Sequence, residues 1–177
     1  GDNLNATDLS TLGGKTGGTV TVSNAVVISG TTDEVTAALV TDETKVVAAS
    51  ATVEISDASS VAELNALAPK AGVITGSIAA SSLASLADLS TSGTDLITIT
   101  VNDDAGDNLD ASDLSALGGK TGGTVTVSNA VNIQGNTAQV TAALVTNETK
   151  VVAASATVEI SNDSTVAELN ALAPKAG

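Results

Sequence analysis

The stretch GKTGGTVTVSNAVVISGTTDEV at residues 14–35 returns as GKTGGTVTVSNAVNIQGNTAQV at residues 119–140. It lies within a longer duplication, in which residues 1–72 recur at 106–177 with 60 of the 72 aligned positions identical. Most of the 12 differences exchange one polar residue for another, as is expected on solvent-facing positions. The chain therefore contains a full repeat, 1–105, and a partial second repeat, 106–177, which we interpret as part of a longer tandem array.

Short runs of β-branched residues mark the expected strands. In each run apolar and polar residues alternate, and this period of two is typical of a half-buried strand. The runs are TVTV at 19–22, TVEI at 52–55, VITGSI at 73–78 and LITITV at 96–101, with the first two repeated at 124–127 and 157–160.

Side chains suited to helix capping precede the Ala- and Leu-rich runs that follow these strands. Four pairs have the spacing of a capping box: Ser60 and Glu63, Thr165 and Glu168, Thr31 and Glu34, and Asn136 and Gln139. Asn5, its counterpart Asp110, and Ser82 are the expected N-caps of further helices. We expect the glycines at 13–14 and the proline at 69 to mark helix ends. Such short helices need packing partners to be stable.

The expected strands start near residues 19, 52, 73 and 96, and the series begins again at 124. One short parallel strand and one short helix in every 20–30 residues, roughly, is typical of a solenoid coil. We therefore predict an α/β solenoid, a rod with about four coils per 105-residue repeat. The longest coil, which starts near 19, is expected to hold an extra bend, near residues 29–30 or 46–50. A doubly wound α/β domain, the alternative, usually has longer helices and does not predict such repetition.

The composition excludes several classes of function. The 177 residues include 20 acidic side chains and 6 lysines, for a net charge of −14, and no Arg, His, Cys, Met, Phe, Tyr or Trp. Zinc, haem and iron–sulfur centres therefore lack their usual ligands. Nucleic-acid binding lacks both positive charge and stacking surfaces. No apolar run is long enough for membrane insertion. The remaining apolar residues, Val, Ile, Leu and Ala, suit the narrow core of a solenoid.

The sequence also predicts that the chain is not an enzyme. Ser and Thr are abundant, but there is no His to activate them, and near-identical repeats do not predict a unique pocket. Gly14-Lys15-Thr16 resembles part of a phosphate-binding loop. However, Leu9 stands where that motif requires its first glycine, and the glycines follow a helix instead of preceding one. We interpret them as a helix end and a turn.

One acidic stretch is a candidate calcium site. Asp103, Asp104, Asp107 and Asp110 supply hard oxygen ligands at the short spacing that suits Ca²⁺. Alignment with an EF-hand loop fails, because Gly106 stands where a ligand is needed and Asp107 where glycine is expected. The other interpretation is a solvated turn in which Asp110 caps the next helix. No other cofactor is expected.

The stretches GKTGGTVTVSNAVVISGTTDEV (14–35), TVEISDASSVAELNAL (52–67) and LITITVNDDAGDNL (96–109) resemble the tandem repeats of giant extracellular and cell-surface proteins of marine cyanobacteria and other bacteria. The resemblance lies in the composition and in the recurring pattern of residues, and it covers essentially the whole chain. It implies export, a structural or adhesive role and, in some members, calcium binding. The glycine-rich nonapeptide calcium repeat of such proteins, GGxGxDxUx, does not occur here.

Together these features predict a structural protein, a repeat segment of an extracellular filament or of a long rod on the cell surface. Its expected partner is itself, through stacking of repeats within one chain or end to end between chains, with a cell surface or matrix as a further partner. The alternatives are a calcium-stabilised adhesin stalk and, more remotely, an ice- or surface-binding solenoid. The latter rests on Thr-x-Thr at 19–21, 98–100 and 124–126, a pattern that Glu54 and Gly76 interrupt.

Overall fold

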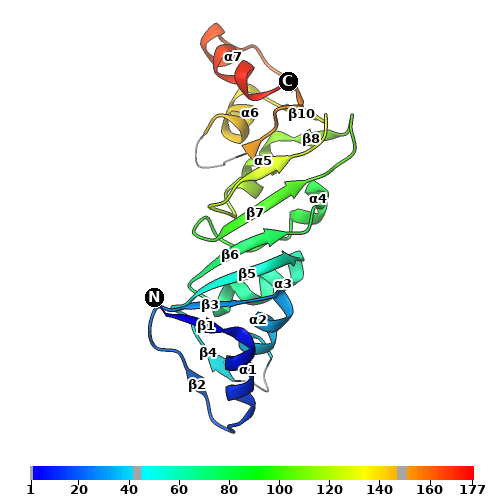
Figure 1. Ribbon diagram of the computed structural model, residues 1–177. Coiled ribbons are helices and arrows are strands. Elements are labelled where there is room, and N and C mark those ends of the chain that lie inside the picture. Colours follow the sequence, from blue (N-terminus) through cyan, green and yellow to red (C-terminus); the bar gives the residue numbers. More distant parts are fainter. Residues whose placement is uncertain (1, 42–44, 147–150) are drawn as a thin grey trace. The chain divides into compact units, whose positions relative to one another are not determined.

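Parallel β-strands alternate with short α-helices along the chain, as the sequence predicts for an α/β fold (Figure 1). The computed structural model describes residues 2–41, 45–146 and 151–177. The chain divides into two compact units: unit 1 comprises residues 1–78 and 94–97, and unit 2 comprises residues 79–93 and 98–177. This division falls within the first sequence repeat and not at its end.

The first two segments of unit 1 each contain a strand, a helix and a second, shorter strand. We call such a strand–helix segment a turn of the chain. They are β1 (Asn3–Asn5), α1 (Ala6–Gly14) and β2 (Val20–Thr21), then β3 (Val27–Gly30), α2 (Thr32–Leu39) and β4 (Val46–Val47). There follow β5 (Thr52–Ser59), α3 (Val61–Leu67), the 3₁₀ turn η1 (Ala68–Lys70) and β6 (Val73–Ile78). Strands β1, β3, β5 and β6 form one parallel ladder, and β2 and β4 form another.

Unit 2 repeats this arrangement in the second copy of the sequence. It contains α4 (Leu83–Leu86), residues 98–101 of β7 (Leu96–Val101), β8 (Asn108–Asp110), α5 (Ala111–Gly118), β9 (Val125–Val127), β10 (Asn132–Gly135), α6 (Thr137–Leu144), β11 (Val151–Val152), β12 (Thr157–Ile160), α7 (Val166–Leu172) and the 3₁₀ turn η2 (Ala173–Lys175). One parallel ladder contains β8, β10 and β12, and the other contains β7, β9 and β11.

The strand register is the same in the two copies. In unit 1, Asn3 lies beside Val27, and Val27 lies beside Thr52 on the following turn of chain. In unit 2 the equivalent residues are neighbours in the same order, because Asn108 lies beside Asn132 and Asn132 beside Thr157. The duplicated sequence therefore produces a duplicated backbone geometry.

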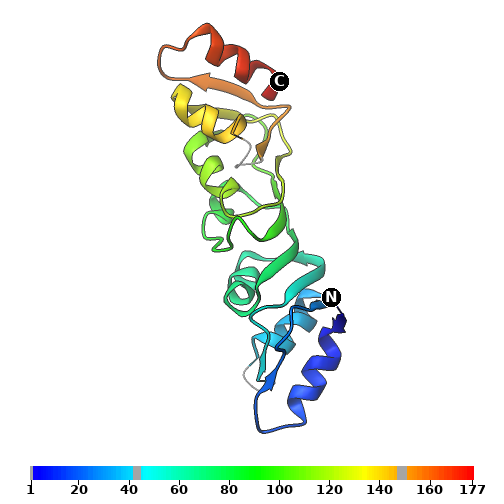
Figure 2. The same ribbon diagram turned by 90° about the vertical axis from the view of Figure 1, so that its left-hand side faces the viewer.

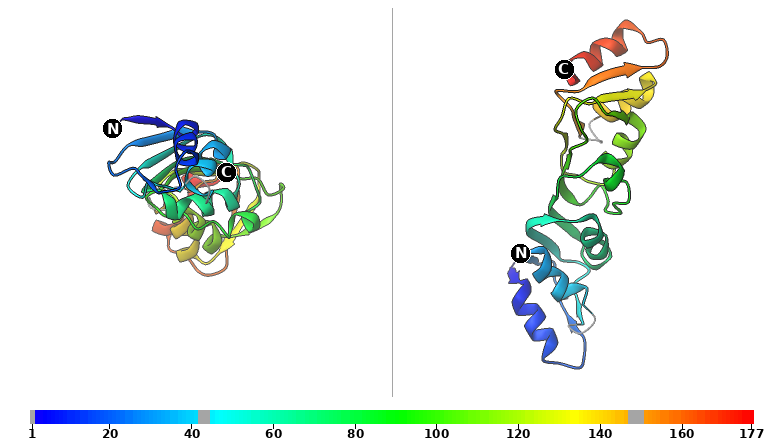
Figure 3. Two further views of the ribbon diagram at one scale, coloured as in Figure 1. Left: turned by 90° about the horizontal axis from the view of Figure 1, so that it is seen from below. Right: turned by 90° about the vertical axis from the view of Figure 1, so that its right-hand side faces the viewer.

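Each core is a ladder of aliphatic side chains with helices packed against it. Ile28, Val53 and Ile74 are neighbours in register across three strands of unit 1, and all three are fully buried. The adjacent helices α1 and α2 contact each other in unit 1 (Figure 2), as α5 and α6 do in unit 2 (Figure 3). Leu109 and Ile133 continue the same pattern in unit 2. Small side chains of similar size stack here without the gaps that an aromatic ring would require.

The register differs from the expected succession of coils. The strands expected from residues 19 and 52 do not pair with each other, because β2 pairs with β4 and β5 pairs with β3 and β6. The bends expected near 29–30 and 46–50 coincide instead with the end of β3 and with β4. Strands β3 and β4 are too short to show a period of two, so the sequence pattern did not reveal them.

Gly30, the last residue of β3, is closely approached by neighbouring residues. A Cβ atom at this position would lie 3.0 Å from the Ala6 Cβ and 3.0 Å from the Glu34 Oε2. Gly135, its counterpart in β10, is equally confined, with the Ala111 Cβ 3.1 Å from the Cβ position. Glycine at this point of the repeat therefore allows a helix and a neighbouring strand to come together.

The helix starts follow the predictions closely, and the helix ends do so in part. All four capping boxes are present with both of their hydrogen bonds, and the side chains of Asn5 and Ser82 accept from backbone N–H groups as predicted. Asp110 occupies the N-cap position of α5, but its side chain makes no capping hydrogen bond. Pro69 lies in the 3₁₀ turn after α3. Gly13 and Gly14 are the last two residues of α1, and Lys15 follows as its C-cap in a right-handed conformation.

Candidate functional site

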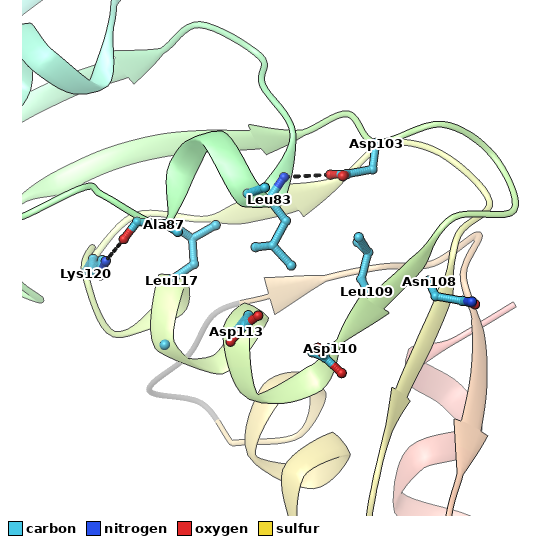
Figure 4. Close-up of a pocket in the computed structure, with 11 residues that line it drawn as sticks. Leu83, Ala87, Asp103, Asn108, Leu109, Asp110, Asp113, Leu117 and Lys120 are labelled. Carbon is cyan, nitrogen blue, oxygen red and sulfur yellow. Dashed lines mark hydrogen bonds between the residues drawn. The ribbon is translucent and has the colours of Figure 1, made fainter.

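A pocket of about 340 Å³ lies between α4 and α5 in unit 2 (Figure 4). Leu83, Leu109 and Leu117 form its apolar part, and polar side chains stand around them. The polar residues are Asp103, Asn108, Asp110, Asp113 and Lys120. The pocket therefore contains two of the four predicted calcium ligands.

Two charged side chains at this pocket are engaged in structural hydrogen bonds. The Asp103 Oδ2 accepts from the backbone N–H of Leu83 at 2.7 Å, at the start of α4. Lys120 donates from its Nζ to the carbonyl oxygen of Ala87, after the end of the same helix. Both side chains join α4 to a neighbouring part of the chain.

The predicted calcium ligands do not converge. Asp103 caps α4, while Asp107 accepts from the backbone N–H of Asp104 at 3.1 Å within a tight turn. Gly106 makes this turn with φ of +91°, a left-handed conformation that favours glycine. Within the described ranges, no three carboxylates lie close enough to hold a metal ion. Asp110 stands at the N-cap position of α5 but does not use its side chain as a cap.

A polar clamp joins successive turns in unit 1. Thr32, the first residue of α2, donates to the Asp57 Oδ1 from its backbone N–H at 2.7 Å and from its hydroxyl at 2.9 Å. The Ser59 hydroxyl lies 2.8 Å from the same Thr32 hydroxyl and is therefore its donor. The N–H of Thr32, followed by its hydroxyl, holds the pKa of Asp57 below its usual range. The backbone N–H at the start of α2 thus finds its acceptor on the following turn of the chain.

The second copy builds the same clamp with a neutral side chain. Thr137 donates to the Asn162 Oδ1 from its backbone N–H at 2.8 Å and from its hydroxyl at 3.0 Å. Ser164 occupies the place of Ser59. The sequence carried a signal for this contact, namely an Asp or Asn two positions before a Ser in both copies, but capping by a later turn was not predicted.

Further hydrogen bonds satisfy backbone groups in the same way. The buried Asp95 accepts from the N–H of Ile74 at 2.8 Å in unit 1. Within the capping boxes, Glu34, Glu63 and Glu168 each accept from an N-cap residue. For Glu34 the cause of a lowered pKa is first the N–H of Thr31, and for the other two it is first the N-cap hydroxyl. These four acidic residues thus serve the fold as hydrogen-bond acceptors.

The Thr-x-Thr strands form a limited surface row. In unit 2, Thr100 lies beside Thr126, and the next residue in register is Val152, which is half exposed. In unit 1, Thr21 lies beside Val47, which is also half exposed. Valine therefore interrupts the threonine row in each unit.

The comparisons with known proteins yield no relative. No family model, no curated protein and no solved structure matches the chain. Across the described residues, no helix is both long enough and apolar enough to cross a membrane.

Proposed function

We propose that the chain is a structural protein, a repeat segment of an extracellular filament or of a long cell-surface rod. The observation that carries this proposal is the shared register: two copies of one sequence pair their successive strands at equivalent residues and in the same order. A backbone that repeats with its sequence extends by adding further copies. The finer fold that we propose is therefore an α/β solenoid.

The proposed mechanism is mechanical. Parallel strand ladders run along the filament, aliphatic side chains fill a thin core, and the Thr32–Asp57 type of clamp ties one turn to the next once in each copy. The net charge of −14 keeps the outer surface soluble by repulsion. At ~4.8 Å per coil, about four coils per repeat advance the filament by about 19 Å.

Imaging of the native material tests the proposal. Electron microscopy is expected to show filaments with an axial repeat of about 19 Å, and strands that cross the filament axis. Strands along the axis would contradict it. Mass measurement under denaturing conditions then separates two forms of the assembly, because one giant band indicates a continuous chain and a small subunit indicates polymerisation.

The composition supports an external location. The chain lacks Cys, Met, His, Trp and Tyr, and so contains almost no side chain that oxidises readily, a useful property in a long-lived fibre. We expect peroxide to damage it more slowly than an ordinary globular protein of similar size. Faster loss of the folded state in peroxide would count against this part of the proposal.

A further inference from the structure

Two identical segments of the chain differ sharply in burial. Residues 12–26 and 117–131 have the same sequence, yet the side chain of Leu12 is 52% exposed and that of Leu117 is 2% exposed. Thr16 is exposed and its counterpart Thr121 is buried. Because the sequences are identical, the difference comes from what packs against each segment.

In unit 2, residues 79–93 and 98–105 cover the segment, and those of α4 lie on its helix side. Leu117 lies with Leu83 and Ala87 in the pocket between α4 and α5 (Figure 4). The backbone carbonyl of Lys120 accepts from the hydroxyl of Thr91 at 2.7 Å, and its Nζ donates to the carbonyl of Ala87. Helix α4 and the chain after it thus cover Leu117 and the end of α5.

The same residues also pair with the strand side of the segment. In the ladder of β7 and β9, the Ile99 N–H donates to the carbonyl of Thr124 at 2.9 Å. The Ser128 N–H donates to the carbonyl of Val101 at 3.0 Å, and the side chain of Asn129 donates to the carbonyl of Asp103 at 2.6 Å. Residues 79–105 therefore contact this segment through a strand, a helix and a turn.

Unit 1 presents the same groups without this cover. Strand β2 is paired with β4 in a two-stranded ladder of the described chain, so its other edge carries no strand. Asn24 is exposed, whereas its counterpart Asn129 is half-buried, and Ser23 is exposed, as is its counterpart Ser128. We define the α1–β2 face by Leu12, Thr16, the outer edge of β2, Ser23 and Asn24.

We propose that the α1–β2 face binds a segment with the sequence of residues 79–105, supplied by a further copy of the repeat. The contacts in unit 2 show how such a segment fits the same sequence at 117–131. The inference rests on the proposed stacking of repeats and specifies the contact through which one repeat meets the next. It differs from simple contact between chain ends, because the occupant is one defined part of the repeat.

The test adds that segment to the full chain. Residues 73–105 are placed directly before Gly1, so that Ala105 meets Gly1 as it meets Gly106 in the natural sequence. Amide exchange measured by NMR is expected to slow by about tenfold or more at Ser23 and to approach that of Ser128. The control is an extension of equal length and composition in scrambled order, which is expected to leave the exchange at Ser23 unchanged.

A second measurement uses the leucine of the same face. Leu12→Ala is expected to change the unfolding midpoint little in the 177-residue chain and as much as Leu117→Ala in the extended chain. Unchanged exchange at Ser23 together with an unchanged effect of Leu12→Ala in the folded, extended chain would overturn the proposal. Self-association of the unextended chain that Leu12→Ala abolishes would also overturn it, because another surface would then be the occupant.

The outcome is separable from that of the proposed function. Protection of Ser23 in the extended chain, with no filament in the native material, would support the contact and contradict the filament. Filaments in the native material, with Ser23 unprotected in the extended chain, would support the filament and overturn this contact.

Discussion

The two copies of the sequence have the same fold but differ in charge at the hydrogen bonds that hold it. Glu34 and Asp57 in the first copy are replaced by Gln139 and Asn162 in the second. Each replacement keeps an oxygen acceptor in the same place: Gln139 accepts from Asn136, as Glu34 accepts from Thr31. The fold therefore requires an oxygen acceptor at these two positions of the repeat and does not require a charge there.

The copies differ also in what packs against them, and this difference has the largest expected effect. Leu117→Ala is expected to lower the free energy of unfolding by about 2–5 kcal/mol, because it removes a buried side chain and leaves a cavity. Leu12→Ala, on the identical sequence, is expected to change it by about 0.5 kcal/mol or less. Denaturant unfolding of the two variants measures the contrast.

Equal losses of unfolding free energy in the two leucine variants would contradict this expected difference. They would mean that Leu12 is covered in solution, as Leu117 is in the structure. Sedimentation of the wild-type chain over a range of concentrations provides the control, because self-association is the means by which separate chains could cover Leu12.

The close approach at Gly30 and Gly135 is expected to be equally strict in both copies. Alanine at either position places a Cβ 3.0 or 3.1 Å from the Cβ of Ala6 or Ala111, and we expect a loss of about 1–3 kcal/mol. Gly14→Ala is the matched control, since nothing lies within 4 Å of a Cβ there. A loss at Gly30 without one at Gly135, measured by thermal unfolding, would show that the two copies pack differently.

Much of the fold was predictable because several signals are local. The strands at 73–78 and 96–101 match the structure to the residue, since a run of this length shows its period of two plainly. The capping boxes depend on side chains three positions apart and were all found. Contacts set by sequence spacing alone could therefore be inferred from one chain.

The rest depends on which turns lie side by side. Strands β3 and β4 are short, and the partner of β5 follows from the register and not from its own sequence. The role of Asp103 was missed for the same reason, because its partner, the N–H of Leu83, lies on an earlier turn of the chain. The acidic cluster was a candidate calcium site beside the alternative of a solvated turn, and the fold directs one of its carboxylates to a helix start.

Acid titration is expected to distinguish the copies by a smaller effect. Hydrogen bonds lower the pKa of Asp57 and Glu34 in the folded state, so their contribution to stability is present above the unfolded pKa values, near about 4, and is lost as the pH falls through the folded values. The variant Asp57→Asn with Glu34→Gln gives the first copy the neutral acceptors of the second. Its stability should fall less than that of the wild type between about pH 5 and pH 2.

A matched control separates these hydrogen bonds from net charge. Asp2→Asn with Glu54→Gln removes two exposed carboxylates and the same number of charges. If this control flattens the pH dependence as much as the acceptor variant does, overall repulsion governs the acid response and the individual clamps do not.

Calcium is expected to have the smallest effect, because Asp103 already uses its carboxylate to cap α4 and the neighbouring acidic residues do not converge on it. The melting midpoint of the chain should be the same in millimolar Ca²⁺ and in chelator. Asp103→Asn keeps an oxygen acceptor for the N–H of Leu83 and should melt close to the wild type, whereas Asp103→Ala should melt lower because that N–H loses its partner. A calcium-dependent rise in the wild type that disappears in Asp103→Asn would restore the calcium-stabilised stalk, since only a metal site needs the charge as well as the acceptor.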